Sequence, residues 1–194
     1  MIKHTEKYKY ILDRLISGGQ TGVDRAALDV ARELGIPTGG WCPAGRRSAR
    51  GAIPARYPLI EASTPAYPQR TRLNIRDSDA TLVISHGPPT GGTRLTITLA
   101  TRLNRPCLVL DFSVSSVAAA QRSLLEWLQF VKPGVLNVAG PRASESPGIG
   151  RKVRTLLKSV LGPPISAVPA QEWPPKQPRT PNLPGIEQET KNQP

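Results

Sequence analysis

The sequence predicts an α/β fold, a Rossmann-like parallel sheet covered by helices on both faces. Short apolar runs alternate with longer segments whose apolar residues recur at helical spacing. Two of the runs, 81–85 and 107–111, are continuously apolar over most of their length, which indicates strands buried on both faces. Such alternation is typical of parallel strands joined by right-handed helical crossovers.

The elements follow from this pattern in chain order. A first strand within 11–17 precedes a glycine-rich loop and a helix at 24–34, which Gly35 ends. An extended piece at 37–41 then leads through a long Gly-, Pro- and Arg-rich loop to a short strand at 59–61. At the last helix, Ser146 is the expected N-cap and Pro147 the first helical residue. The remaining elements are a helix at 68–77, a strand at 81–85, a helix at 91–103, a strand at 107–111, a helix at 117–131, a strand at 135–139 and a helix at 147–161.

Composition divides the chain into two parts. Residues 1–162 are expected to form one Rossmann-like ligand-binding domain, and residues 163–194 a disordered, Pro-rich tail. The tail holds nine of the 21 prolines and has no apolar periodicity, so it suits neither a helix nor a central strand. Its acidic and basic residues cancel, so the net charge of +12 belongs to the domain.

That charge limits the possible functions. A basic surface favours a small anionic ligand, whereas an aromatic content of 5% argues against stacking on single-stranded nucleic acid. No apolar run is long enough to span a membrane, and the first ten residues have no apolar signal core, so a soluble, cytoplasmic protein is expected. Cys42 and Cys107 suit neither a disulfide framework nor a zinc site, and we expect no metal site. Cys42 is read as packing, with a reactive thiol or a ligand for a soft metal as alternatives.

Two glycine-rich loops directly follow strands, where ligands bind in such sheets. Glycines let the backbone approach a ligand, and a helix N-terminus attracts an anion. We expect the two strands to be neighbours, so that both helix N-termini hold one phosphate or similar anion. The structural alternatives are a tight turn, a capping box of Thr21 with Asp24, and helix capping by Thr93. The candidate residues are Gly18, Gly19, Gln20, Thr21 and Gly22 in the first loop and Gly91, Gly92 and Thr93 in the second.

Three arginines are candidate anion contacts. Arg46 lies in the long loop beside Gly45, Arg70 in the first turn of a helix, and Arg142 after the last strand. Asn74 follows Arg70 by four residues and therefore shares its helix face. The alternative for Arg46 is a solvated surface position.

Together these motifs resemble the family of molybdenum carrier proteins. That family is Rossmann-like and is related to lysine-decarboxylase-like proteins and to cytokinin-activating phosphoribohydrolases. The resemblance covers about residues 14–161 in the same order. The segments that carry it are 17–29, 40–43 with 45–46, 53–54 with 57–59, 76–79, 91–93 and 137–142.

The resemblance implies binding, protection and carriage of the molybdenum cofactor, a molybdopterin that bears a phosphate, by a protein without catalytic activity. It implies homo-oligomers, commonly tetramers, and molybdoenzymes or cofactor insertases as partners. By the same resemblance, residues 19–22 and 91–93 cradle the ligand, and Arg46, Arg70 and Arg142 contact its anionic groups.

Two competing functions remain. A sensor or hydrolase of a nucleotide-derived ligand is the first alternative, because the same loops suit any ribose phosphate. The related phosphoribohydrolases, however, carry a catalytic glutamate three residues after the threonine of the second loop, and this chain has Thr96 there. Asp24 is the acid expected to lie near enough to replace it. Nucleic-acid binding is the second alternative, favoured by charge and opposed by the few aromatic residues.

Overall fold

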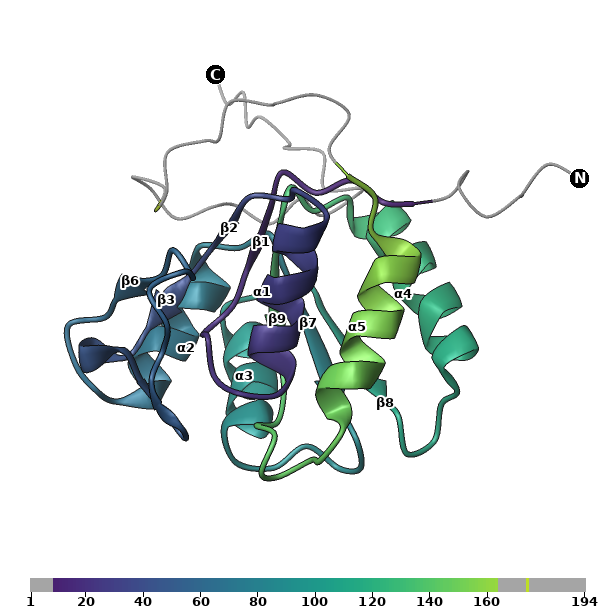
Figure 1. Ribbon diagram of the computed structural model, residues 1–194. Coiled ribbons are helices and arrows are strands. Elements are labelled where there is room, and N and C mark those ends of the chain that lie inside the picture. The colour runs from purple at the N-terminus through teal and green to yellow at the C-terminus, as the bar shows by residue number, and fades with distance from the viewer. Residues whose placement is uncertain (1–8, 164–173, 175–194) are drawn as a thin grey trace, which may run out of the picture.

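A central sheet of five parallel strands organises the computed structural model, which describes residues 9–163 and 174 (Figure 1). The strands lie in the order β2-β1-β9-β7-β8, and each pair of neighbours is parallel. This confirms the predicted fold class. The bounds are β1 Arg14–Ile16, β2 Thr38–Gly39, β7 Ala80–Ser85, β8 Cys107–Asp111 and β9 Val135–Ala139.

Helices cover both faces of this sheet. On one face α1 packs against α5 and α5 against α4, while α2 and α3 pack together on the other. The division follows from right-handed crossovers, because α1 and α4 connect strands in one direction along the sheet and α3 connects them in the opposite direction. The helices are α1 Val23–Glu33, α2 Tyr67–Arg76, α3 Gly91–Arg102, α4 Val117–Val131 and α5 Ile149–Val160.

The core lies between the sheet and the α1/α4/α5 layer. Leu82 and Leu136 from the central strands are fully buried, as are Leu28 of α1, Leu124 of α4 and Val153 of α5. All five lie in segments that the sequence pattern predicts as strands or helices of this sheet. Burying such side chains stabilises the fold by about 1.5–3 kcal/mol each, and it holds the strand ends in fixed positions.

The order of the strands corrects one prediction. We expected the strands before the two glycine-rich loops, β1 and β7, to be neighbours, but β9 lies between them and pairs with both. The loop that follows β9 therefore lies between the two glycine-rich loops. Apolar patterning shows that a strand exists but not where it inserts in a sheet.

The predicted piece at 37–41 is two short strands instead of one. Its first part is β2 in the main sheet, whereas β3 (Trp41–Cys42) pairs with β6 (Ile60–Glu61) in a separate parallel pair. The amide of Asn74 explains the split, because it accepts from Trp41 N at 2.8 Å and donates to Trp41 O at 3.0 Å. Between these strands lie a short 3-10 helix, η1 (Ala44–Arg46), and a hairpin of β4 (Arg47–Ser48) with β5 (Gly51–Ala52).

Two further expectations are wrong. Strand β8 is buried on one face only: it lies at the sheet edge, and Val109 is 39% exposed. Helix α5 begins at Ile149 with Gly148 as its N-cap, so Ser146 and Pro147 precede the helix. Apart from Pro163 and Pro174, the predicted tail at 163–194 lies outside the described residues. Within the described part of the chain, no helix combines the length and apolarity needed to cross a membrane.

Candidate functional site

An open pocket of about 230 Å³ lies beyond the carboxyl ends of β7 and β9, at the first turn of α3. We call it the outer pocket. Helix α2 supplies a second wall, which combines the apolar surface of the Tyr67 ring and Pro68 with the charged side chain of Arg70. Its lining residues are Gln20, Tyr67, Pro68, Arg70, Thr71, Gly91, Gly92, Thr93, Leu95, Gly140, Arg142 and Glu145.

The start of α3 faces this pocket without a side-chain cap. Thr90 is the N-cap residue and its side chain makes no capping hydrogen bond. Gly91 has φ +47°, a backbone conformation that favours glycine. Gly92 has no such positive φ, and a Cβ added at Gly92 would meet no atom within 4 Å. The fold therefore does not require glycine at position 92. Thr93 lies inside the helix and lines the pocket, so the alternative that it caps the helix is wrong.

Two of the three predicted arginines reach the outer pocket. Arg70 comes from α2 and is mostly buried, with 14% of its side chain exposed. Its guanidinium carbon lies 5.7 Å from the centre of the Tyr67 ring. Arg142 follows β9, is 39% exposed, and its Nε lies 3.0 Å from a carboxylate oxygen of Glu145. Both guanidinium groups are positioned on the same pocket as the open N-terminus of α3.

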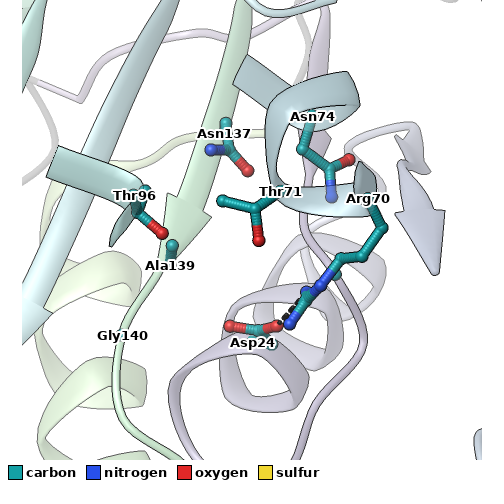
Figure 2. Close-up of a pocket in the computed structure, with 9 residues that line it drawn as sticks. Asp24, Arg70, Thr71, Asn74, Thr96, Asn137, Ala139 and Gly140 are labelled. Carbon is teal, nitrogen blue, oxygen red and sulfur yellow. Dashed lines mark hydrogen bonds and ion pairs between the residues drawn. The ribbon is translucent and has the colours of Figure 1, made fainter. Parts of the chain in front are cut away.

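A smaller cavity of about 30 Å³ adjoins the outer pocket, and we call it the recess (Figure 2). The two share Arg70, Thr71 and Gly140 in their walls. Its other lining residues are Gly18, Asp24, Asn74, Thr96, Asn137 and Ala139.

Asp24 and Arg70 form an ion pair at the floor of the recess. Oδ2 of Asp24 accepts hydrogen bonds from Arg70 Nη1 and from Gln20 N, both at 3.1 Å. Burial raises the pKa of Asp24 above its ordinary value, and the positive charge of Arg70 opposes that shift. A Cβ at Gly18 would collide with the guanidinium of Arg70, so glycine at this position makes room for the ion pair.

Comparison with known proteins identifies the family of the chain. A sequence model described as the circularly permutated YpsA SLOG family matches residues 15–161. The chain belongs to this family. A solved structure named "Putative molybdenum carrier protein", from Syntrophus aciditrophicus SB, is 44% identical, covers 78% of this chain and 96% of its own, and superposes with a TM-score of 0.76. The resemblance inferred from the motifs is thereby confirmed. The comparison with curated proteins finds no match.

In this member of the circularly permutated YpsA SLOG family, Arg46 stabilises the fold and does not line the pocket. Its guanidinium donates to the carbonyl oxygens of Ile53, Pro54, Tyr57 and Leu59, at 2.9–3.1 Å. These four bonds hold the long loop between β5 and β6 in place. Because the donor groups face main-chain oxygens, the prediction that Arg46 contacts an anion is wrong.

The N-terminus of α1 is also unavailable to an anion in this family member. Val23 N donates to Pro141 O at 3.3 Å, and a Cβ at Gly22 would collide with that carbonyl. The loop after β9 thus covers this helix end, which follows from the position of β9 beside β1. Thr21 accepts from Ala143 N, and Gly19 faces Ile53 and Leu59. The prediction that the N-termini of these two helices share one anion is therefore wrong, because of the two only that of α3 opens onto the outer pocket.

Eight of the twelve predicted site residues line the outer pocket or the recess, and Gly19, Thr21, Gly22 and Arg46 do not. Asn74 lines the recess, although its amide group already forms two hydrogen bonds with the backbone of Trp41. The eight are Gly18, Gln20, Arg70, Asn74, Gly91, Gly92, Thr93 and Arg142.

Sequence reasoning overlooked Tyr67, Thr96, Asn137 and Glu145. Thr96 follows Gly92 by four residues, a spacing that places both on one helix side. Asn137 is a polar residue within an apolar strand, and a buried polar group needs a partner. These two signals were available in the chain, whereas Tyr67 and Glu145 carry no comparable local signal.

Among the described residues, no group of three or more His, Cys, Asp or Glu side chains could hold a metal ion. Cys42 is fully buried within the core, which agrees with packing, and burial raises the pKa of its thiol. Chemically, the site offers an open helix N-terminus, two guanidinium groups and an apolar wall. That combination suits a ligand with an anionic group and an unsaturated ring.

Proposed function

We propose that the protein binds, protects and carries the phosphate-bearing molybdenum cofactor, without transforming it. The observation that carries the proposal is Gly92, because a glycine that the fold does not require opens the N-terminus of α3 to the outer pocket. Backbone N–H groups there would donate to the phosphate, as helix N-termini do in other phosphate sites. Arg142 would add a charge-assisted contact to the same group, and Arg70 a positive charge in the wall of the pocket.

The relative from Syntrophus aciditrophicus SB supports the choice of ligand through its name, and the pocket supports it through its size and chemistry. An open cavity of about 230 Å³ with an aromatic side chain would hold a phosphate and part of a flat heterocycle joined to it. The net charge of +12 would draw such a polyanion from solution.

The proposal is tested by mixing the purified full chain with molybdenum cofactor released from a molybdoenzyme. Pterin that co-elutes on gel filtration is oxidised and quantified by fluorescence. We expect about one pterin per chain, and displacement by excess inorganic pyrophosphate. Elution of free pterin, or binding that pyrophosphate does not reduce, would contradict the proposal.

Glu145 favours a second candidate, a hydrolase of a nucleotide-derived ligand. Glu145 lines the outer pocket, so the site has a second acid besides Asp24 that could take the place of the missing glutamate. Helix α3 itself carries Thr96 in place of an acid, and the hydroxyl of Thr96 donates to Gly92 O. We therefore expect no release of free base from nucleoside monophosphates in a chromatographic assay. Release that is lost in Glu145→Gln or Asp24→Asn would replace the carrier with the enzyme.

We also propose a homo-oligomer, a tetramer by analogy with the family. The outer edge of β8 has no neighbouring strand in the described part of the chain, and its Val109 is 39% exposed. An open edge with an apolar residue supports association. Light scattering coupled to gel filtration measures the assembly, and a monomeric mass at micromolar concentration would contradict it. Molybdoenzymes or cofactor insertases would be its partners in handing over the ligand.

A further inference from the structure

The recess has room for one small chemical group. A volume of about 30 Å³ admits a group about the size of a water molecule. It lies one helical turn below the start of α3, because Thr96 follows Gly92 by four residues, or about 6 Å along the axis. A ligand whose phosphate lies at the start of α3 can therefore extend into it from the outer pocket.

Four side chains turn hydrogen-bond acceptors toward the recess. The hydroxyls of Thr71 and Thr96 already donate to Tyr67 O at 3.0 Å and to Gly92 O at 2.9 Å, so only their lone pairs remain. Asn137 donates through Nδ2 to Thr81 Oγ1, and Figure 2 shows its amide oxygen turned toward Thr71. The carboxylate of Asp24 offers a further acceptor.

The same recess carries little net charge, and one of the residues that line it has a buried donor atom without a partner. Arg70 neutralises Asp24 through their ion pair, 3.1 Å long. Nε of Arg70 is buried and has no hydrogen-bond partner among the described residues. A buried donor without a partner is costly, so a ligand atom that accepts from it gains affinity.

These features select among possible groups. A hydroxyl brings a single proton to several acceptors, and an ammonium brings a charge that Asp24, already paired with Arg70, does not neutralise. An uncharged amino group on a heteroaromatic ring brings two N–H donors, and the ring nitrogen beside it can accept from Arg70 Nε. We infer that the recess binds the ring amino group of a phosphate-bearing aminoheterocycle. This inference rests on the proposed function and adds which end of the ligand the protein recognises.

Three nucleotides that differ at one ring position test this inference. Guanosine, inosine and xanthosine 5′-monophosphates carry an amino group, a hydrogen or an oxygen at C2, with the same phosphate. Isothermal titration of the full chain should show guanosine monophosphate binding about tenfold tighter than inosine monophosphate, from about one net hydrogen bond. Xanthosine monophosphate should bind most weakly, because its oxygen faces the acceptors.

Thr96→Val keeps the shape of the side chain and removes its oxygen from the recess. We expect the preference for guanosine over inosine monophosphate to fall about threefold or more. Thr98→Val is the matched control, because Thr98 is exposed on the same helix and makes the same kind of bond, to Arg94 O at 3.1 Å. It should leave the preference unchanged.

Equal binding of the guanosine and inosine compounds to the wild-type chain, or an unchanged preference in Thr96→Val, would overturn the inference. Inorganic pyrophosphate, which has no amino group, is titrated in parallel. If the chain binds pyrophosphate but does not discriminate between the nucleotides, the proposed anion site stands and the proposed role of the recess is wrong. A chain that does not bind pyrophosphate loses the proposed function itself.

Discussion

Replacing Gly92 with valine separates the binding site from the fold. A Cβ at this position meets no atom within 4 Å, the backbone is not in the left-handed region, and residue 92 is exposed, so we expect the fold to accept a valine here. Valine in a helix is favoured over glycine by roughly 0.3–0.5 kcal/mol. The melting temperature should therefore stay the same or rise by about 2 °C.

The same side chain should abolish ligand binding. Three added carbon atoms would occupy the space where an anion approaches the backbone N–H groups of α3. Losing two charge-assisted hydrogen bonds costs about 3 kcal/mol or more, which is a hundredfold or greater rise in Kd, at about 1.4 kcal/mol per tenfold.

Isothermal titration with pyrophosphate and thermal unfolding measure the two effects on the same samples. Ala118→Val is the matched control, because Ala118 is the exposed second residue of α4, as Gly92 is of α3. The control should leave affinity unchanged. Undiminished binding by Gly92→Val would remove the start of α3 from the site, and a large loss of stability would show that the fold needs this glycine.

The remaining predictions concern the fold around the site. Arg46→Lys should lower stability by about 2 kcal/mol, because lysine cannot satisfy four carbonyls; a pyrophosphate affinity that falls with no change in melting temperature would instead return Arg46 to the site. The N–H groups of Ser113 and Gly87 hold the pKa of Asp111 below its ordinary value. Its stabilisation is thus present above that ordinary value and lost as pH falls through the lowered pKa, so Asp111→Asn should lower the melting temperature at pH 7, and this difference from the wild type should shrink as the pH is lowered below the ordinary value; a difference that does not depend on pH would contradict this. Truncation after Gly162 should leave the melting temperature unchanged, because the removed segment has no apolar face to bury; precipitation or early melting would show that it packs.

Local patterns predicted the elements and the second glycine-rich loop well, and for a physical reason. Apolar periodicity and the glycines at 91 and 92 depend on neighbours in sequence, so they can be read without the fold. Arg70 was also found in this way, since a basic residue in the first turn of a helix opposes the helix dipole and suggests an anion.

The parts that failed depend on contacts distant in sequence. An arginine beside a glycine looks the same whether its partners are a ligand or, as for Arg46, four carbonyls. Pro141 covers the N-terminus of α1 because β9 lies between β1 and β7, and no local sequence pattern shows this strand order. Asn137 stands out locally as a polar residue in an apolar strand, but its partner, Thr81, lies on a neighbouring strand and cannot be read from the local sequence.

Native mass spectrometry of the full chain, purified from cells that make the molybdenum cofactor, tests the carrier proposal most directly. Acid release and oxidation of the same sample then report any pterin by its fluorescence. We expect a bound mass equal to molybdopterin, with or without molybdenum, fluorescence in proportion to it, and loss of both in Gly92→Val. A chain that carries a nucleotide in place of pterin, or an adduct that persists in Gly92→Val, would contradict the account.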